Sequence, residues 1–363
     1  MILYEDSINL LRQMVRIPSL SGQEAAVAAC VREALAGFGI PCEEVRGNLL
    51  ALNRRFDPSK PTIALDAHLD TVPVNHGYTR DPYDSGNDPD IVYGLGSNDD
   101  GGSVVSMIAA FRHFYEQELP INLMLILSRE EEVSGPDGTR WIFAPDGLFA
   151  TDSRWSRPQW VIVGEPTQMR AATSERGLLV LDGEAQGVSG HAARGEGVNA
   201  LYIALDDIQA LREHRFTKHS PRMGDVRLSV TQIEAGQAHN VIPDRCHFVV
   251  DIRPTEQYTN EEIVDELQAF CKSTLKARNL ANRSSATREG SPLLRTAEAL
   301  GIETFSSPTT SDWMRIPVDA IKMGPGDSSR SHKADEFIRT SEIREGIDKY
   351  IAFIEMFYGN TLE

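Results

Sequence analysis

Hydrophobic residues recur with two different spacings along residues 1–172. In three segments they return every three or four positions, as on one face of a helix. These segments are residues 5–17, 24–38 and 103–116. Four shorter runs are apolar at nearly every position, which is typical of strands buried on both faces. These runs are residues 48–52, 62–66, 121–128 and 160–164. Strands that alternate with helices predict an α/β domain with helices on both faces of its sheet.

The pattern changes after residue 172. Strands with alternating polar and apolar positions now predominate, and two amphipathic helices lie between them. The predicted strands are residues 177–186, 226–235, 245–253 and, more weakly, 283–288, and the predicted helices are residues 199–213 and 260–277. Asn260 is a candidate N-cap of the second helix. The order β-α-β-β-α-β is that of a split βαβ, or ferredoxin-like, unit.

The last part of the chain, residues 289–363, returns to helices and short strands. The simplest architecture is therefore one α/β domain made of residues 1–172 and 286–363, interrupted by an inserted α+β domain of residues 173–285. Two domains also suit the length, because 363 residues exceed the roughly 250–300 at which a single core usually stops growing.

Composition and charge exclude several kinds of partner. With 53 acidic and 36 basic residues the formal net charge is −17, so the chain repels the phosphate backbone of nucleic acids. Its longest strongly apolar stretch, residues 121–127, is far shorter than the ~20 residues of a membrane helix. The N-terminus, MILYEDSINLL, carries acids where a signal peptide is basic, and the four cysteines form no CxxC pair. We therefore expect a cytoplasmic protein with reduced thiols and no nucleic-acid or membrane partner.

Polar clusters stand at the ends of the predicted apolar strands and before one helix. They comprise His68 with Asp70, Asp99 with Asp100, Glu130–Glu132, and Glu165. In an open α/β sheet, ligands bind beyond the carboxyl ends of the strands. The histidine and the glutamates follow such ends, and Asp99 stands just before a predicted helix. We therefore expect these side chains to converge on one site.

Carboxylates gathered in one place repel each other, and the strings around them hold no matching set of Lys or Arg. A pair of divalent metal ions would balance the charge. Imidazole and carboxylate ligands without cysteine suit zinc, cobalt or manganese. Asp70, two residues beyond His68, is placed to hold the imidazole, as carboxylates commonly do for metal-bound histidines.

Each cluster also has a simpler interpretation. A lone His-x-Asp is commonly a polar loop, three successive glutamates a solvated helix start, and Asp-Asp between glycines a tight turn or cap. Their joint occurrence at corresponding strand ends favours a site. Five of the other histidines are not expected to bind metal. His113 lies within a predicted helix, and His76, His214, His219 and His247 lack metal-binding company.

Taken in order, several strings resemble the co-catalytic zinc deacylases and exopeptidases, which include acetylornithine deacetylase, succinyl-diaminopimelate desuccinylase, aminoacylases and carnosine-type dipeptidases. The strings are LDAHLDTVP (65–73), YGLGSNDDGG (93–102), SREEEVSG (128–135), VGEPT (163–167), GVSGHAARG (187–195), HNVIPD (239–244), DIRP (251–254), SPTTSD (307–312) and GPGDSSRSHKADE (324–336). The resemblance spans nearly the whole chain. It implies a zinc-exopeptidase-like catalytic domain with a mixed sheet, and an inserted ferredoxin-like domain that serves as a lid and for dimerisation.

The resemblance also implies a ligand set for two divalent metal ions per subunit, zinc or cobalt. His68, Asp99 and Glu165 would hold one ion. Asp99 would bridge to a second ion, held by Glu132 and His332.

Further roles follow from the same resemblance. Glu131 would be the general base, and Asp70 would orient the imidazole of the first metal site. His191, on the insert, would stabilise the oxyanion, and in relatives this residue reaches across a dimer into the other subunit's site. Asn240 and Arg253 would bind the substrate's carboxylate. The simpler interpretations of the last three are an exposed loop histidine, an asparagine turn and a surface arginine at a strand end.

Two departures from the family's pattern bear on substrate preference. Gly101 stands where relatives often carry a basic residue, and Glu130 stands where an aspartate is common. Neither departure removes a metal ligand, so the resemblance still implies an active enzyme.

The strings ERGLLVLD, HNVIPD and SPTTSD with GPGDSSRSH look closest to the acetylornithine deacetylase branch. The implied reaction is hydrolysis of the amide of N-acetyl-ornithine, or of N-succinyl-ornithine or N-acetyl-citrulline, in arginine biosynthesis, without a covalent acyl-enzyme. Succinyl-diaminopimelate desuccinylase and a metallo-dipeptidase are alternatives. An inactive metal- or amino-acid-binding homologue is a further alternative, against which the intact Glu131 weighs.

Overall fold

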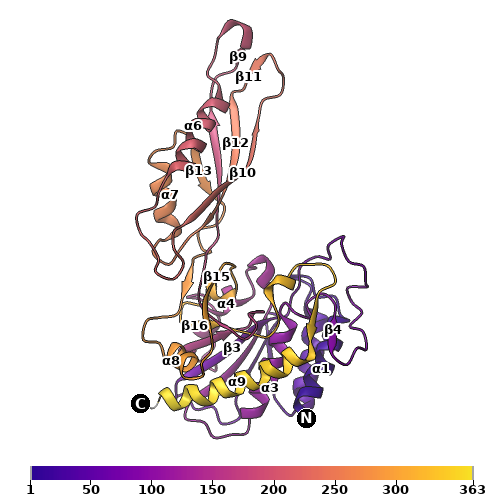
Figure 1. Ribbon diagram of the computed structural model, residues 1–363. Coiled ribbons are helices and arrows are strands. Elements are labelled where there is room, and N and C mark those ends of the chain that lie inside the picture. The colour runs from indigo at the N-terminus through magenta and orange to yellow at the C-terminus, as the bar shows by residue number, and fades with distance from the viewer. Residues whose placement is uncertain (1, 362–363) are drawn as a thin grey trace. The chain divides into compact units, whose positions relative to one another are not determined.

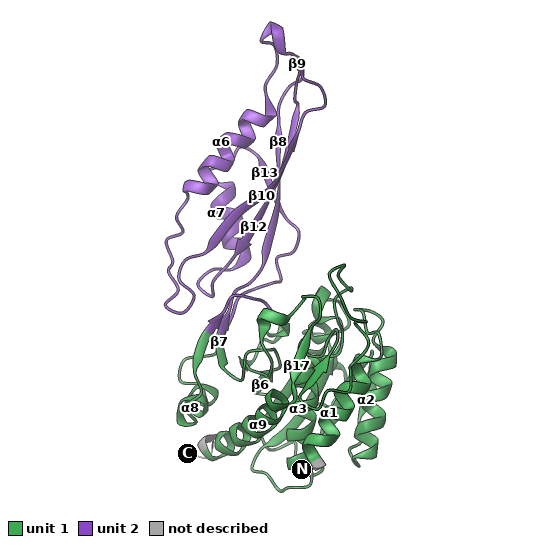
Figure 2. Ribbon diagram, turned by 45° about the vertical axis from the view of Figure 1, so that its right-hand side comes forward, with its two compact units in different colours: residues 1–173, 286–305, 311–363 green, residues 174–285, 306–310 purple. Residues whose placement is uncertain are grey.

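The computed structural model describes residues 2–361, which divide into two compact units (Figure 2). Unit 1 comprises residues 1–173, 286–305 and 311–363, and unit 2 comprises residues 174–285 and 306–310. Among the described residues, no helix is long and apolar enough to cross a membrane.

Unit 1 is built on a mixed sheet, which contains nine strands in the described chain. The strands are, in sheet order, β1 (Glu43–Val45), β2 (Asn48–Leu52), β5 (Asn122–Ser128), β3 (Thr62–His68), β6 (Trp160–Val163), β16 (Asp319–Lys322), β7 (Ala171–Glu175) and β14 (Ser285–Ala286), with β15 (Thr304–Ser307) beside β7. The central strands β5, β3, β6 and β16 run parallel, and β2 joins β5 antiparallel. Their carboxyl ends therefore open on the same edge of the sheet.

Helices cover both faces of this sheet, as predicted, but unequally (Figure 1). The long helices pack on one face through a large apolar core. They are α1 (Ile2–Val15), α2 (Ala25–Gly37), α3 (Gly101–Phe114), α8 (Pro292–Ala299) and α9 (Thr340–Thr361). The other face carries only short elements: α4 (Thr139–Ile142), α5 (Leu148–Thr151) and the 3-10 helix η3 (Asp312–Arg315). A separate two-stranded ribbon pairs β4 (Ile91–Tyr93) with β17 (Phe337–Arg339).

Unit 2 has the predicted β-α-β-β-α-β order. Its elements are β8 (Leu179–Gln186), α6 (Ala200–Glu213), β10 (Arg227–Ala235), β12 (Arg245–Arg253), α7 (Asn260–Gln268) and β13 (Thr274–Ala277). The sheet order is β10-β12-β8-β13, antiparallel throughout, and both helices pack on one face of it. A small ribbon of β9 (Gly190–His191) and β11 (Val241–Ile242) extends from one end of this sheet (Figure 2).

Two details of the unit 2 prediction are wrong. The helix predicted over 260–277 ends at Gln268, and residues 274–277 form the fourth strand, which the sequence had placed near 283–288. The break is held from outside the segment, because the Asp207 carboxylate on α6 accepts the backbone N–H groups of Lys272 and Ser273. Thr259, rather than Asn260, caps α7, through a capping box with Glu262.

Candidate active site

The strand ends of unit 1 bring the predicted site residues together. His68 is the last residue of β3, the turn η1 (Glu131–Val133) follows β5, and Glu165 follows β6. Possible metal-ligating atoms form two groups, each within 4.8 Å: His68 with Glu131 and Glu165, and His68 with Asp99 and Glu132. The convergence follows from topology, because β5, β3 and β6 are parallel neighbours.

Asp99 lies between two imidazoles. Its Oδ1 is 3.3 Å from Nε2 of His68, and its Oδ2 is 3.6 Å from Nε2 of His332. The same His332 nitrogen is 3.0 Å from the Glu132 carboxylate. Each Asp99 oxygen thus faces a different histidine, which is the arrangement that a bridging carboxylate needs.

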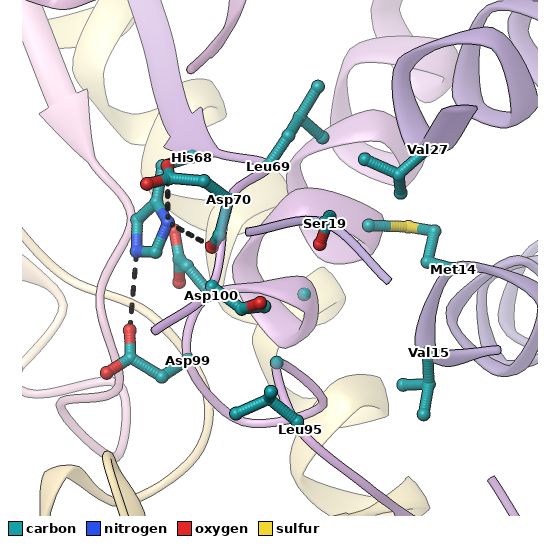
Figure 3. A pocket seen from close by; sticks show the side chains of 13 residues that line it. Met14, Val15, Ser19, Val27, His68, Leu69, Asp70, Leu95, Asp99 and Asp100 are labelled. Atoms are coloured by element: carbon teal, nitrogen blue, oxygen red, sulfur yellow. Dashed lines mark hydrogen bonds and ion pairs between the residues drawn. The ribbon is translucent and has the colours of Figure 1, made fainter. Parts of the chain in front are cut away.

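Asp70 organises both the histidine and the glutamate turn. Nδ1 of His68 lies 3.0 Å from the Asp70 backbone oxygen and 3.5 Å from its carboxylate, so Nε2 is turned toward Asp99 (Figure 3). The backbone N–H groups of Glu131 and Glu132 donate to the same carboxylate at 3.0 and 3.2 Å. One buried aspartate therefore orients a candidate ligand and the turn that carries the candidate base.

Apolar side chains of the helical layer lie next to the polar cluster. Met14 of α1, Val27 of α2 and Leu95 line a small hollow beside His68 and Asp99, with a volume of about 20 Å³ (Figure 3). Such a hollow has room for about one water molecule. The helical layer thus packs directly against the back of the polar cluster and restricts its side chains.

Burial and mutual repulsion disfavour the ionised form of two glutamates in the cluster. Burial raises the pKa of Glu131 well above its usual range, and neighbouring carboxylates, that of Glu165 first, raise it further. Burial likewise raises the pKa of Glu165, with repulsion from Asp99. Two imidazoles partly balance this charge. Burial alone would lower the pKa of His68, but hydrogen bonds to Asp70 and Asp99 outweigh it and raise that pKa.

This donor set fits divalent metal ions. Imidazole nitrogens and carboxylate oxygens without thiolates are ligands that zinc, cobalt and manganese accept. Divalent cations would also stabilise the ionised form of Glu131 and Glu165, whose pKa values burial raises.

The predicted site residues of unit 2 lie at two ends of its sheet. His191 ends β9 and is paired with Val241 of β11, and the Asn240 backbone oxygen accepts the N–H of Ala192 at 3.1 Å. His191 and Asn240 are thus neighbours on the ribbon. Arg253 ends β12, eight residues beyond Arg245 at the ribbon end, which is about 27 Å of strand at ~3.4 Å per residue. Within one copy of unit 2, Asn240 and Arg253 cannot hold the same carboxylate.

Arg253 already has a partner. Its Nε and Nη2 donate to the two carboxylate oxygens of Asp251, at 2.9 and 3.1 Å. The remaining N–H groups of the guanidinium can still face a ligand, and the aspartate fixes the plane of the fork.

The structure adds three charged residues that the sequence reasoning missed. Asp312 accepts the hydroxyl groups of Ser128 and Thr139, and burial raises its pKa to about 6. Lys322 is buried at the end of β16, and its charge lowers the pKa of Glu165. Glu336 is buried beside Asp99. The strand-end rule could have found Lys322, and Asp312 and Glu336 end two of the quoted strings, SPTTSD and GPGDSSRSHKADE.

The chain is similar to known proteins in both sequence and fold. The sequence model of Peptidase family M20/M25/M40 matches residues 64–356. Acetylornithine deacetylase of Proteus mirabilis is 28% identical, with 91% of each chain covered. Succinyl-diaminopimelate desuccinylase of Delftia acidovorans is 25% identical, with 93% of this chain and 94% of the relative covered.

Among solved structures, aminopeptidase PepT of Bacillus cereus aligns with a TM-score of 0.76 at 19% identity, covering 98% of both chains. The YXEP protein of Bacillus subtilis, described as a dinuclear metal binding peptidase from the M20 family, aligns with a TM-score of 0.72 at 17% identity. That alignment covers 98% of this chain and 99% of the other. At these identities the likeness establishes the fold alone.

Proposed function

The chain belongs to peptidase family M20/M25/M40 and is a metal-dependent amide hydrolase, and we propose that it removes the acyl group from an N-acylated amino acid, N-acetyl-ornithine first. The observation that carries the metal-dependent chemistry is the Asp99 carboxylate held between His68 and His332 at the carboxyl edge of the sheet. The names of the two curated relatives support a deacylase, and N-succinyl-ornithine and N-acetyl-citrulline are the variant substrates.

We assign two divalent ions to each chain, zinc or cobalt. His68, Asp99 and Glu165 would hold one, where the imidazole lies 3.3 Å from Asp99 and belongs to one group of ligating atoms with Glu165. Asp99, Glu132 and His332 would hold the other. When bound, such a pair supplies a water of lowered pKa and polarises the scissile carbonyl. Asp70 keeps Nε2 of the first imidazole directed at the ions through its contacts with Nδ1.

Glu131 is the proposed proton carrier. Its raised pKa suits a group that takes a proton from water and returns it to the leaving amine. Its backbone N–H donates to Asp70, so the carboxylate is held on a turn fixed at its base. In this proposal water attacks the scissile carbonyl directly, without an acyl-enzyme.

A homodimer would resolve the separation within unit 2. His191 and Asn240 lie on the ribbon, and Arg253 lies about 27 Å of strand away, so one copy cannot bring all three to one substrate. We propose that the ribbon of a second copy supplies His191 as an oxyanion donor and Asn240 as a carboxylate ligand, while Arg253 comes from the first copy. The ribbon and α6 expose the apolar side chains Val241, Tyr202 and Leu205, at 45%, 65% and 47%, which suits pairing of two chains.

Arg253 supports a substrate with a free α-carboxylate beside the acylated amine, since guanidinium binds carboxylate through parallel hydrogen bonds. The biological setting would be arginine biosynthesis in the cytoplasm, where all four cysteines can stay the free thiols they are here. Desuccinylation of succinyl-diaminopimelate is the alternative that a curated relative favours.

A panel assay tests the proposal. Chelated protein should hydrolyse nothing, and zinc or cobalt should restore activity on N-acetyl- or N-succinyl-ornithine above that on succinyl-diaminopimelate or unblocked dipeptides. Preference for dipeptides with a free amino terminus would exclude the deacylase assignment. Full activity in metal-free protein would exclude the metal assignment, and no hydrolysis of any amide by reconstituted protein would favour an inactive binding homologue.

A further inference from the structure

Glu336 joins the two segments of unit 1 that carry Asp99 and His332. Its side chain is only 2% exposed. One carboxylate oxygen accepts the backbone N–H groups of Asn98 and Asp99, at 2.8 and 2.9 Å, and the other accepts that of Gly96 at 3.2 Å. The Glu336 backbone oxygen accepts the N–H of Gly94 at 2.8 Å.

Two glycines shape the loop that Glu336 holds. Gly94 and Gly96 have φ values of +110° and +76°, so the chain bends there in conformations that favour glycine. A Cβ at Gly96 would meet Thr71 at 2.6 Å, so the loop also runs close to its neighbours. Its N–H groups point inward, where they need acceptors, and Glu336 supplies three of these bonds.

Other contacts hold the two segments together independently of Glu336. The Asn98 side chain bonds both ways with the backbone of Asp327, at 2.9 and 3.1 Å. The strands β4 and β17 pair on the other side of the loop. Removing the Glu336 carboxylate should therefore leave the segments joined while freeing the backbone that aims Asp99.

We infer that Glu336 is a positioning residue that sets Asp99 against His332, so that both can ligate the second metal ion. The inference rests on the metal site of the proposed function. Glu336 makes no contact with substrate in this scheme, and it acts through the Asp99 backbone. His332 lies four residues before it in the same short segment, so one residue fixes the spacing of both ligands.

Glu336→Ala, Glu336→Gln and Glu342→Ala, compared as full-length chelated proteins, separate the possibilities. Glu336→Ala leaves all three N–H groups without their acceptor, and loss of such an outer partner costs roughly 10–100-fold in metal affinity. In a titration of Glu336→Ala with Zn²⁺ we expect the affinity of the weaker of two binding steps to fall by that factor. Glu336→Gln keeps an oxygen for Asn98 and Asp99, so its loss should stay below about tenfold.

Glu342 provides the matched control. Its carboxylate also ties this segment, through Arg330 and the N–H of Arg339, but it makes no contact with residues 94–99 among the described contacts. Glu342→Ala should bind Zn²⁺ like the wild type. In Co²⁺-loaded proteins the visible absorption bands should change for Glu336→Ala alone, because only there does the ligand geometry change.

Each outcome decides one question. If Glu336→Ala bound both Zn²⁺ ions as tightly as the wild type, the positioning role would be overturned. Equal loss in Glu336→Gln and Glu336→Ala would show that charge rather than placement matters, and equal loss in Glu342→Ala would show general loosening of the segment; both overturn it. A wild-type protein that binds fewer than two ions would instead contradict the proposed function, whatever the variants do.

Discussion

In unit 1 the candidate ligands His68, Asp99, Glu132 and His332 approach one another at 3.0–3.6 Å, whereas in unit 2 His191 lies on the ribbon at one end of the sheet and Arg253 lies at the other end. Except for His332, whose imidazole is 55% exposed, the first group is buried or partly buried, and carboxylates such as Asp70 and Glu336 hold it. On the ribbon of unit 2, His191 is exposed and its Nδ1 accepts only the nearby N–H of Ala193 among the described contacts. The candidate metal ligands thus all come from unit 1 of one chain, whereas one copy of unit 2 cannot bring Asn240 on its ribbon and Arg253 to the same carboxylate.

The largest expected effect falls within the unit 1 cluster and separates two adjacent glutamates. Glu131→Gln removes the proton carrier, so turnover should fall by about 10²–10⁴, while metal content stays near two ions per chain. Glu132→Gln removes a ligand that pairs with His332, so occupancy of one ion should fall as well. Steady-state kinetics with metal analysis of the purified variants measures both effects.

Both substitutions preserve the volume of the side chain, so the two variants serve as controls for each other. If Glu131→Gln lost a metal ion and Glu132→Gln kept both, the two roles would have to be exchanged. Of the two groups of ligating atoms, one contains Glu131 and the other Glu132, so the experiment also decides which of these glutamates is a metal ligand.

The next effect belongs to unit 2 and tests whether the ribbon acts at all. His191→Ala should lower turnover by roughly 10²–10³, as loss of an oxyanion donor does, with metal content unchanged. Mixing it with Glu131→Gln protein should restore part of the activity in hybrid dimers, because one site then combines an intact base with an intact histidine.

Subunit exchange must be demonstrated separately, for example by mass spectrometry of differently tagged chains. Exchange without recovery would mean that His191 serves its own chain. A monomeric wild-type enzyme with full activity would remove the need for a second copy altogether.

The difference between the two regions also explains what the sequence could predict. The strand-end clusters His68, Glu131 and Glu165 follow from hydrophobic runs and parallel topology, both of which are local or simply periodic. The end of α7 at Gln268 is different, because Asp207 determines it from about sixty residues away in the chain. The apolar spacing of residues 260–277 continues through the break, so periodicity alone extends the helix.

The same limit applies to charges that act over long chain separations. Glu336 bonds to a loop some 240 residues earlier, and Asp312 bonds to Ser128 and Thr139. Nothing in a one-dimensional pattern reveals such pairs. The separation of Asn240 from Arg253 likewise needed the register of β12 with β8.

A smaller effect concerns Arg253 and the substrate's carboxylate. Arg253→Lys keeps the charge but loses the fork held by Asp251, so kcat/KM for N-acetyl-ornithine should fall by about 10–100-fold. The loss should be much smaller for the carboxyl-amidated substrate, which offers no charge to bind. Kinetics on the matched acid and amide substrates measures the difference.

Arg278→Lys is the matched control, since Arg278 forms the same kind of fork with Asp182 in unit 2. We expect it to leave kcat/KM unchanged for both substrates. Wild-type enzyme that hydrolyses amidated substrates as fast as free acids would contradict the role of Arg253.

The smallest effect is the pH dependence of the metal-free protein, and it tests how tightly the unit 1 cluster is coupled. The hydrogen bond to Glu132 raises the pKa of His332 to about 9, above its ordinary 6.5. The hydrogen bond of the protonated imidazole to Glu132 therefore contributes its full stabilisation of the folded state below pH 6.5, and this stabilisation is lost as pH rises through 9. Because the imidazole is 55% exposed, solvent screening should limit this contribution to about 1 kcal/mol or less.

All four tryptophans, Trp141, Trp155, Trp160 and Trp313, lie in unit 1, so fluorescence-detected urea unfolding of chelated protein reports on that unit alone. The free energy of unfolding should fall between pH 6.5 and 9 in the wild type, and Glu132→Gln should remove most of the part assigned to His332. An equal fall in that variant would place the pH dependence elsewhere and would mean that Glu132, although 3.0 Å from His332, contributes little to the charge state of that imidazole.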